Sequence, residues 1–209
     1  MERVNLFSPF YYKTHINETD LLKKVHLEAI LNNYKALPSH SSDWNVHTSY
    51  GNNNLKLPFE IDWRYFKHIY KSYIDKFCLE YFSTNVKWEI QNDIWYNVYG
   101  KGQNGMVHNH IDSDFAAVHY LKFNPQIHSG TTFINPRSRE LAYHKVTPRA
   151  LLDKLNYDWV DHSFYYERYT PKVVEGDLII FPASMDHLIR KNDSDELRVT
   201  IAFNLKIIG

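Results

Sequence analysis

Hydrophobic residues follow two different periods along the chain, and the change between them falls near residue 85. Up to that point apolar positions recur every three or four residues, which is the spacing of an amphipathic helix. Beyond it, short runs alternate between apolar and polar residues and are separated by Gly, Pro, Asn and Asp, as strands joined by turns are. The pattern predicts a helical layer over 1–85 and a β-rich core over 86–207.

Two helices are expected in the N-terminal layer. The first carries Leu22, Val25 and Ala29 at helical spacing and ends before Pro38, because proline cannot continue a helix. The second runs over about 62–81. Its apolar face consists of Phe66, Ile69, Tyr73, Phe77 and Tyr81.

The remaining sequence predicts a series of short strands. They are expected at 86–99, 106–112, 115–123, 130–134, 177–181, 187–191 and 197–207, with one more within 161–174. Such strands after a helical layer indicate a mainly β fold, a jelly roll of the kind found in cupins, with two helices packed on one sheet. The length suits a single domain over 1–209, interrupted by an insertion at about 135–161, a place where lids and binding loops occur.

Composition excludes several classes of protein. Lys plus Arg and Asp plus Glu both number 24, so no basic surface for nucleic acid is expected. The one cysteine, Cys78, cannot form an internal disulfide, which favours a reducing compartment. The first residues lack the apolar stretch of a signal peptide, and no run reaches transmembrane length. We therefore expect a soluble cytoplasmic protein with no membrane contact; no pattern indicates its oligomeric state.

The strongest candidate for chemistry is His110-Ile111-Asp112. On a strand, residues two apart project to the same face, so an imidazole and a carboxylate at this spacing can bind one metal ion. His26-Leu27-Glu28 has a similar pattern but falls on the first predicted helix, where residues two apart diverge. His108 shares the predicted strand face with His110 and Asp112, so it is an alternative ligand.

A third ligand is expected from His187, at the start of a later predicted strand. If the polar run 192–195 closes a hairpin, His187 pairs near Thr200. Two histidines and one aspartate would then form the facial triad of non-haem Fe(II) oxygenases. On the last strand one face is apolar and should pack on the helices, while the other should line the interior. The interior face carries Arg198, Thr200, Ala202 and Asn204.

An arginine that faces the interior requires an anion, because an unpaired buried guanidinium is costly. Its planar fork suits a carboxylate, and Thr200 adds a hydroxyl. The arrangement predicts a small dicarboxylate held between the metal and Arg198. A structural ion pair of Arg198 with Asp112 or Asp186 is the alternative.

These residues resemble the signature of the 2-oxoglutarate/Fe(II)-dependent oxygenases. The resemblance covers roughly 88–206 and is closer to a group of such oxygenases from marine bacteria and their phages. Its motifs are Trp95-Tyr96-Asn97-Val98-Tyr99, Gly102, Asn104, His108-x-His110, Val118-x-Tyr120-Leu121, Ser129-Gly130, Phe181-Pro182 and Ala202-Phe203-Asn204. That group emphasises the two histidines and varies at Asp112, so a set of His108, His110 and His187 stays open beside His110, Asp112 and His187.

The resemblance implies a double-stranded β-helix fold that uses Fe(II), 2-oxoglutarate and O₂ to hydroxylate a small-molecule or peptidyl substrate, releasing succinate and CO₂. Arg198 and Thr200 would bind 2-oxoglutarate, with Asn97 and Tyr120 reaching it or the substrate from inward positions. His108 and Asn204 would face the substrate, and no catalytic side chain beyond the metal ligands is expected. A three-histidine cupin enzyme that does not use 2-oxoglutarate, or a non-catalytic binding module, remains possible on the sequence alone.

Overall fold

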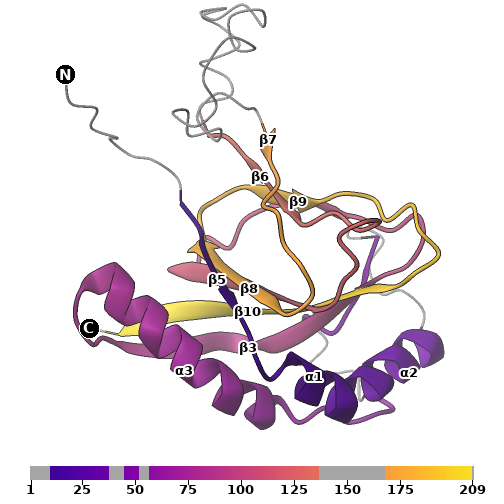
Figure 1. Ribbon diagram of the computed structural model, residues 1–209, viewed down its shortest axis with the longest axis horizontal. Coiled ribbons are helices and arrows are strands. Elements are labelled where there is room, and N and C mark those ends of the chain that lie inside the picture. Colours follow the sequence, from indigo (N-terminus) through magenta and orange to yellow (C-terminus); the bar gives the residue numbers. More distant parts are fainter. Residues whose placement is uncertain (1–9, 38–44, 52–56, 137–167, 209) are drawn as a thin grey trace, which may run out of the picture.

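The computed structural model describes residues 10–37, 45–51, 57–136 and 168–208, and within them two antiparallel sheets face each other (Figure 1). The larger sheet has the order β1 (Tyr12–His15), β8 (Asp177–Pro182), β5 (Phe115–Lys122), β10 (Arg198–Ile208), β3 (Lys87–Tyr99) and β2 (His47–Thr48). The smaller has the order β4 (Gly105–His108), β9 (His187–Ile189), β6 (Thr131–Ile134) and β7 (Arg168–Tyr169). This is the predicted double-sheet architecture.

The helices cover the outer face of the larger sheet (Figure 1). The first expected helix is continuous but changes pitch: α1 (Thr19–Leu22), a π-helical turn η1 (Lys23–Leu27) and α2 (Glu28–Ala36). The second is α3 (Trp63–Phe82), which begins where the side chain of Asp62 accepts a hydrogen bond from the Arg64 N–H. Both predicted helices are confirmed, and in the part of the chain that the structure describes no helix is long and apolar enough to cross a membrane.

The main core lies between these helices and the larger sheet. Strand β10 sends one apolar face toward the helices, as its alternation predicts, and Phe203 stacks on Tyr70 of α3 with ring centroids 5.0 Å apart. That face consists of Val199, Ile201, Phe203 and Leu205, all 0% exposed. The opposite face of β10 is therefore turned toward the space between the two sheets.

The predicted pairing of the last two strands is wrong. Strand β9 lies in the smaller sheet, where His187 pairs with His108 and with Phe133, whereas β10 lies in the larger sheet, where Thr200 pairs with Asn97. The polar run 192–195 is thus a crossover between sheets. Asn192 holds it, because its side-chain amide donates to the backbone oxygens of Tyr99, at 2.9 Å, and Glu196, at 2.8 Å.

Other differences concern short elements and strand ends. Strands β1 and β2 are four and two residues long, too short for an alternation to be visible in the sequence. Strand β4 ends at His108 rather than at residue 112, because the chain turns there. Strand β7 confirms the extra strand expected within 161–174. The expected insertion at 135–161 lies almost wholly outside the described residues.

Candidate metal centre and active site

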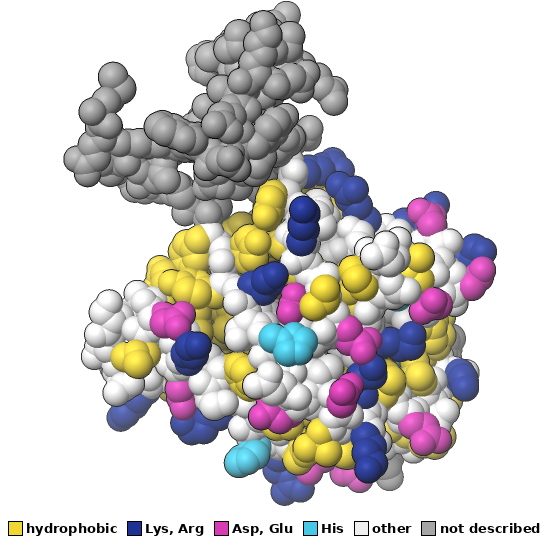
Figure 2. All heavy atoms as spheres, in the orientation of Figure 1, with side chains coloured by type: hydrophobic (Ala, Val, Ile, Leu, Met, Phe, Trp, Pro, Cys, Tyr) yellow, Lys and Arg dark blue, Asp and Glu magenta, His cyan; other side chains and the backbone are white. Residues whose placement is uncertain are grey.

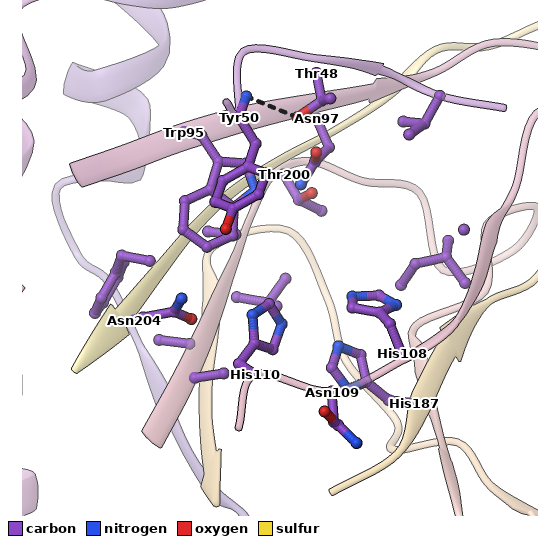
Figure 3. Close-up of a pocket in the computed structure, with 18 of the residues that line it drawn as sticks. Thr48, Tyr50, Trp95, Asn97, His108, Asn109, His110, His187, Thr200 and Asn204 are labelled. Atoms are coloured by element: carbon purple, nitrogen blue, oxygen red, sulfur yellow. Dashed lines mark hydrogen bonds between the residues drawn. The ribbon is translucent and has the colours of Figure 1, made fainter. Parts of the chain in front are cut away.

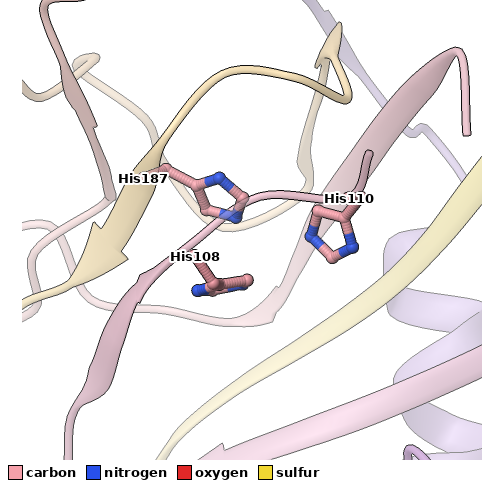
Figure 4. Close-up of side chains that lie close together, drawn as sticks. All are labelled: His108, His110 and His187. Carbon is pink, nitrogen blue, oxygen red and sulfur yellow. The ribbon is translucent and has the colours of Figure 1, made fainter. Parts of the chain in front are cut away.

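Three histidines meet between the sheets, at the edge strand β4 and its neighbour β9 (Figure 4). His108 ends β4, His187 begins β9 opposite it, and His110 follows two residues after β4. One ligand nitrogen from each lies within 4.8 Å of the other two. This spacing allows all three imidazoles to bind a single ion, since Nε2 or Nδ1 coordinates metals at about 2 Å.

Backbone carbonyls fix the orientation of two of these rings. Nδ1 of His108 donates to the Met106 oxygen at 2.8 Å, and Nδ1 of His187 donates to the Met185 oxygen at 2.9 Å. Because a carbonyl only accepts, each Nδ1 carries the proton and each Nε2 presents a lone pair. A hydrogen bond from the ring nitrogen that does not bind the metal is the usual way in which proteins orient a metal-binding histidine.

The electrostatics keep the three histidines neutral. Burial, together with the neighbouring His108, lowers the pKa of His187 to about 3 and that of His110 to about 4. Burial also lowers the pKa of His108 itself. Neutral imidazole is the form that binds metal, so the group is in its binding state at neutral pH without competition from protons.

Asp112 does not join this group. The chain turns after His110, whose N–H donates to the Ala183 oxygen at 2.8 Å and whose oxygen accepts from Ser113 N–H at 3.0 Å. Asp112 lies in that turn with an exposed side chain, and among the described residues the candidate metal-binding group contains three histidines and no carboxylate. The expectation that Asp112 would share a face with His110 rested on an extended strand, which ends too early.

A cavity of about 330 Å³ opens beside the histidines, between β3, β5 and β10 on one side and β4 and β9 on the other (Figure 3). Of the residues expected from sequence, His108, His110, His187, Asn97, Thr200 and Asn204 line it; Asp112, Arg198 and Tyr120 are not among its lining residues. Sequence reasoning missed Tyr50, Trp95, Tyr99 and Asn109. Trp95 and Tyr99 were detectable, because they alternate with Asn97 along one strand face; Tyr50 carried no such signal.

Arg198 lies just behind this lining, at the Tyr99 end of the cavity. It is 2% exposed, and its Cζ is 4.9 Å from the Tyr99 ring centroid and 5.7 Å from that of Tyr120. No ion pair joins it to a described carboxylate, and its Nε and Nη2 have no hydrogen-bond partner among the described residues. Asp186, the alternative partner, instead accepts from the Asn109 amide at 2.8 Å.

The part of the chain that the structure describes thus supplies no carboxylate partner for the buried guanidinium. Burial lowers its pKa, but an arginine keeps its charge in proteins, and an isolated buried charge costs several kcal/mol. Thr200 lies two residues along β10, opposite Asn97, and both line the cavity. A carboxylate that reached Arg198 past Thr200 would neutralise the charge.

The Tyr120 hydroxyl makes hydrogen bonds within the protein. The hydroxyl donates to Thr131 Oγ1 at 3.0 Å and accepts from the Thr131 N–H at 3.0 Å, so it links β5 to β6. Its ring faces the guanidinium of Arg198 instead. Tyr120 thereby helps to hold the arginine in position.

The three histidines and the buried arginine fit the metal and the dicarboxylate expected from the sequence. Three neutral imidazoles suit iron, and a buried, unpaired arginine on the same interior suits the far carboxylate of a dicarboxylic acid. The cavity extends from the histidines to Tyr99, whose ring lies against the Arg198 guanidinium.

Comparisons with known proteins agree with this chemistry. The family model described as "Putative 2OG-Fe(II) oxygenase" matches residues 93–204, more than half of the chain. These residues include the three histidines, Arg198 and the cavity strands. No curated protein matches the sequence.

Solved structures of similar shape share little sequence and show the fold alone. A prolyl-4-hydroxylase of Pseudomonas putida has a TM-score of 0.57 at 12% identity, covering 97% of this chain and 95% of that one. A viral collagen prolyl hydroxylase from Paramecium Bursaria Chlorella virus-1, in a 2OG complex, has a TM-score of 0.56 at 12% identity over 95% and 96%. SnoK, an alpha ketoglutarate dependent carbocyclase from nogalamycin biosynthesis, has 0.57 at 14% over 94% and 79%.

The fold of these neighbours is the double-stranded β-helix of 2-oxoglutarate oxygenases, as expected from the sequence. The family match adds the chemistry, because it covers the segment that builds the histidine group and the buried arginine. The chain belongs to the 2OG-Fe(II) oxygenase family and is an enzyme that uses Fe(II), 2-oxoglutarate and O₂.

Proposed function

We propose that this oxygenase hydroxylates its substrate at an iron held by His108, His110 and His187. The observation that supports this set of ligands is that one nitrogen of each of the three histidines lies within 4.8 Å of the other two, and Asp112 is outside the group. Family membership sets aside the two other interpretations of the sequence, an enzyme independent of 2-oxoglutarate and a non-catalytic module.

Arg198 is proposed to bind the far carboxylate of 2-oxoglutarate, with Thr200 and Asn97 beside it on the cavity wall. Fe(II) with 2-oxoglutarate and O₂ supplies oxidative decarboxylation to succinate and CO₂, coupled to oxidation of a substrate C–H bond. The chain contributes position. The carbonyl-anchored rings of His108 and His187 hold their nitrogens in place, and the buried arginine directs the co-substrate toward them.

The charge of this set differs from that of a carboxylate triad. Three neutral imidazoles leave both charges of Fe(II) uncompensated by the protein, and Arg198 adds a third positive charge nearby. A dianionic co-substrate therefore meets a net charge of +3 here, against +2 beside an aspartate ligand. This favours an ordered assembly in which 2-oxoglutarate and metal strengthen each other's binding.

The test is anaerobic titration with Fe(II) and 2-oxoglutarate, followed by the visible metal-to-ligand charge-transfer band. The wild-type protein and Asp112→Ala should both develop the band, whereas His108→Ala should not, because it removes one of three ligands. The two substituted positions are four residues apart on one segment, so each variant controls for a local disturbance of the fold in the other. Loss of the band in Asp112→Ala with retention in His108→Ala would restore the aspartate set.

The proposal extends to the domain organisation, the substrate class and the location of the protein. We treat 1–209 as one domain, with the helical layer over 1–85 supporting the core over 86–207. A small-molecule or peptidyl substrate is favoured over nucleic acid, since basic and acidic side chains are interspersed on the face seen in Figure 2. A cytoplasmic location and a marine bacterial or phage source stay predictions.

A further inference from the structure

An unsatisfied amide lies at one end of the cavity (Figure 3). Asn204 is 4% exposed and lines the cavity, yet its Oδ1 has no hydrogen-bond partner among the described residues. Buried side-chain oxygens are nearly always satisfied in folded proteins, because leaving one unpaired lowers stability. The missing donor is therefore expected from a molecule that enters the cavity.

That molecule is not 2-oxoglutarate. Asn204 and Arg198 lie on the same face of β10 but six positions apart, which is ~20 Å along an extended strand. A five-carbon diacid that reaches Arg198 spans less than half of this distance. The amide and the guanidinium thus serve two different ligands, and Asn204 belongs to the substrate end.

The surroundings of Asn204 form a slot beside the metal-binding group. Trp95 and Tyr50 make its aromatic wall, with ring centroids 4.7 Å apart, and the Trp95 ring is 6.1 Å from that of His110. The residues beside Asn204 are small. Ala116 is its partner on β5, and Ala202, two positions before it on β10, pairs with Trp95. All of these side chains line the cavity, so the indole face and the small alanines border the same space as Asn204.

The slot offers no partner for a charged group. None of the described residues that line the cavity is Lys, Arg, Asp or Glu. An ionised group moved from water into such a lining loses its hydration without gaining a counter-charge. The slot therefore favours an uncharged group over an ammonium or a carboxylate.

We propose that the substrate places an uncharged amide, the carboxamide or peptide bond of a blocked amino-acid residue, in the slot formed by Asn204, Trp95 and Tyr50. The inference rests on the proposed function and names the substrate class of the same site. The amide N–H donates to Asn204 Oδ1, and the amide plane stacks on the indole of Trp95. A free amino acid, which carries two charges at neutral pH, is rejected.

The test compares N-acetyl amino-acid amides, one for each of the common side chains, with the corresponding free amino acids. Binding is measured by saturation-transfer NMR to the protein loaded with Mn(II) and 2-oxoglutarate, and turnover by succinate release from the Fe(II) form. We expect a subset of the blocked amides to bind and to stimulate succinate release, and the free amino acids to do neither.

Two variants of Asn204 sharpen the test. Asn204→Leu keeps the size but removes the amide, and should weaken binding of the active blocked amides about 10- to 100-fold. Asn204→Asp introduces a charge and should shift the preference toward cationic probes. Both variants should keep the charge-transfer band with Fe(II) and 2-oxoglutarate, which shows that the fold and the co-substrate site are intact.

Several results would overturn the inference: free amino acids that bind as well as blocked amides, no binding by any blocked amide, or an Asn204→Leu variant with unchanged affinity. A missing charge-transfer band in the wild-type protein would instead count against the proposed function. The two failures are therefore distinguishable.

Discussion

Replacing Arg198 by methionine should make the ligand-free protein more stable while abolishing its response to 2-oxoglutarate. Methionine approximates the length of the arginine stem, so little volume is lost. The guanidinium that it removes is 2% exposed and has two nitrogens without a described partner. The substitution thus separates a binding role for Arg198 from a structural one.

The magnitude follows from opposing contributions. Two buried unpaired nitrogens cost about 1–3 kcal/mol each, whereas loss of the cation–π contacts with Tyr99 and Tyr120 costs about 2 kcal/mol. The net expectation is a gain of about 2 kcal/mol, or about 4–8 °C in Tm for a chain of 209 residues. Loss of two charge-assisted hydrogen bonds, about 1.5–3 kcal/mol each, should raise the Kd for 2-oxoglutarate by at least about 100-fold.

The assay is thermal unfolding, first without metal and then with Mn(II) and increasing 2-oxoglutarate. At 100 times its Kd the co-substrate stabilises the wild-type protein by about 2.7 kcal/mol, a shift that Arg198→Met should lack. Arg190→Met, at an exposed position directly after β9, controls for loss of a positive charge. A lower Tm for metal-free Arg198→Met would refute the unpaired-charge argument, and a retained 2-oxoglutarate shift would refute the binding role.

Three further predictions concern stability. Burial lowers the pKa of His119 to about 3, against 6.5 in the unfolded chain, so the unfolded state takes up a proton first as the pH falls. The free energy of unfolding should therefore decrease below pH 6.5, by about 2 kcal/mol at pH 5. Urea unfolding at several pH values should show a weaker pH dependence of this free energy for His119→Asn, and an equal dependence would contradict the argument. Phe203→Ala should cost about 3–5 kcal/mol in the same assay, because the ring is 0% exposed, whereas Leu79→Ala at a half-exposed position should cost far less; similar losses would argue against the assigned core. Gly102→Ala should cost about 1–2 kcal/mol from its positive φ of 82° alone, since no atom lies within 4 Å of the added Cβ, and a neutral effect would show that the loop relaxes.

Much of the fold was predictable because it depends on local periodicity. The alternation along 197–207 correctly placed Phe203 toward the helices and Asn204 toward the interior, since a strand has only two faces. The same rule placed Arg198 inside. Helix α3 was visible from its apolar repeat. These features do not depend on which strands pair with one another.

Strand pairing and strand ends were not predictable in this way. The run 192–195 has the composition of a hairpin turn, but it is a crossover between sheets, held by a hydrogen bond from Asn192 to the distant Tyr99 backbone. The end of β4 depends on where the chain meets Ala183, far away in sequence. That contact turns Asp112 outward and leaves His108 beside His187.

The sequence by itself determined a helix-covered jelly roll with histidines, an arginine and polar residues on inward faces, because side-chain direction along a strand is a local property. Only the tertiary structure decided which of these side chains share one site. It brought His108 beside His110 and His187, and Tyr50 against Trp95, because the positions of turns and the approach of separate strands are fixed by contacts between residues far apart in the chain.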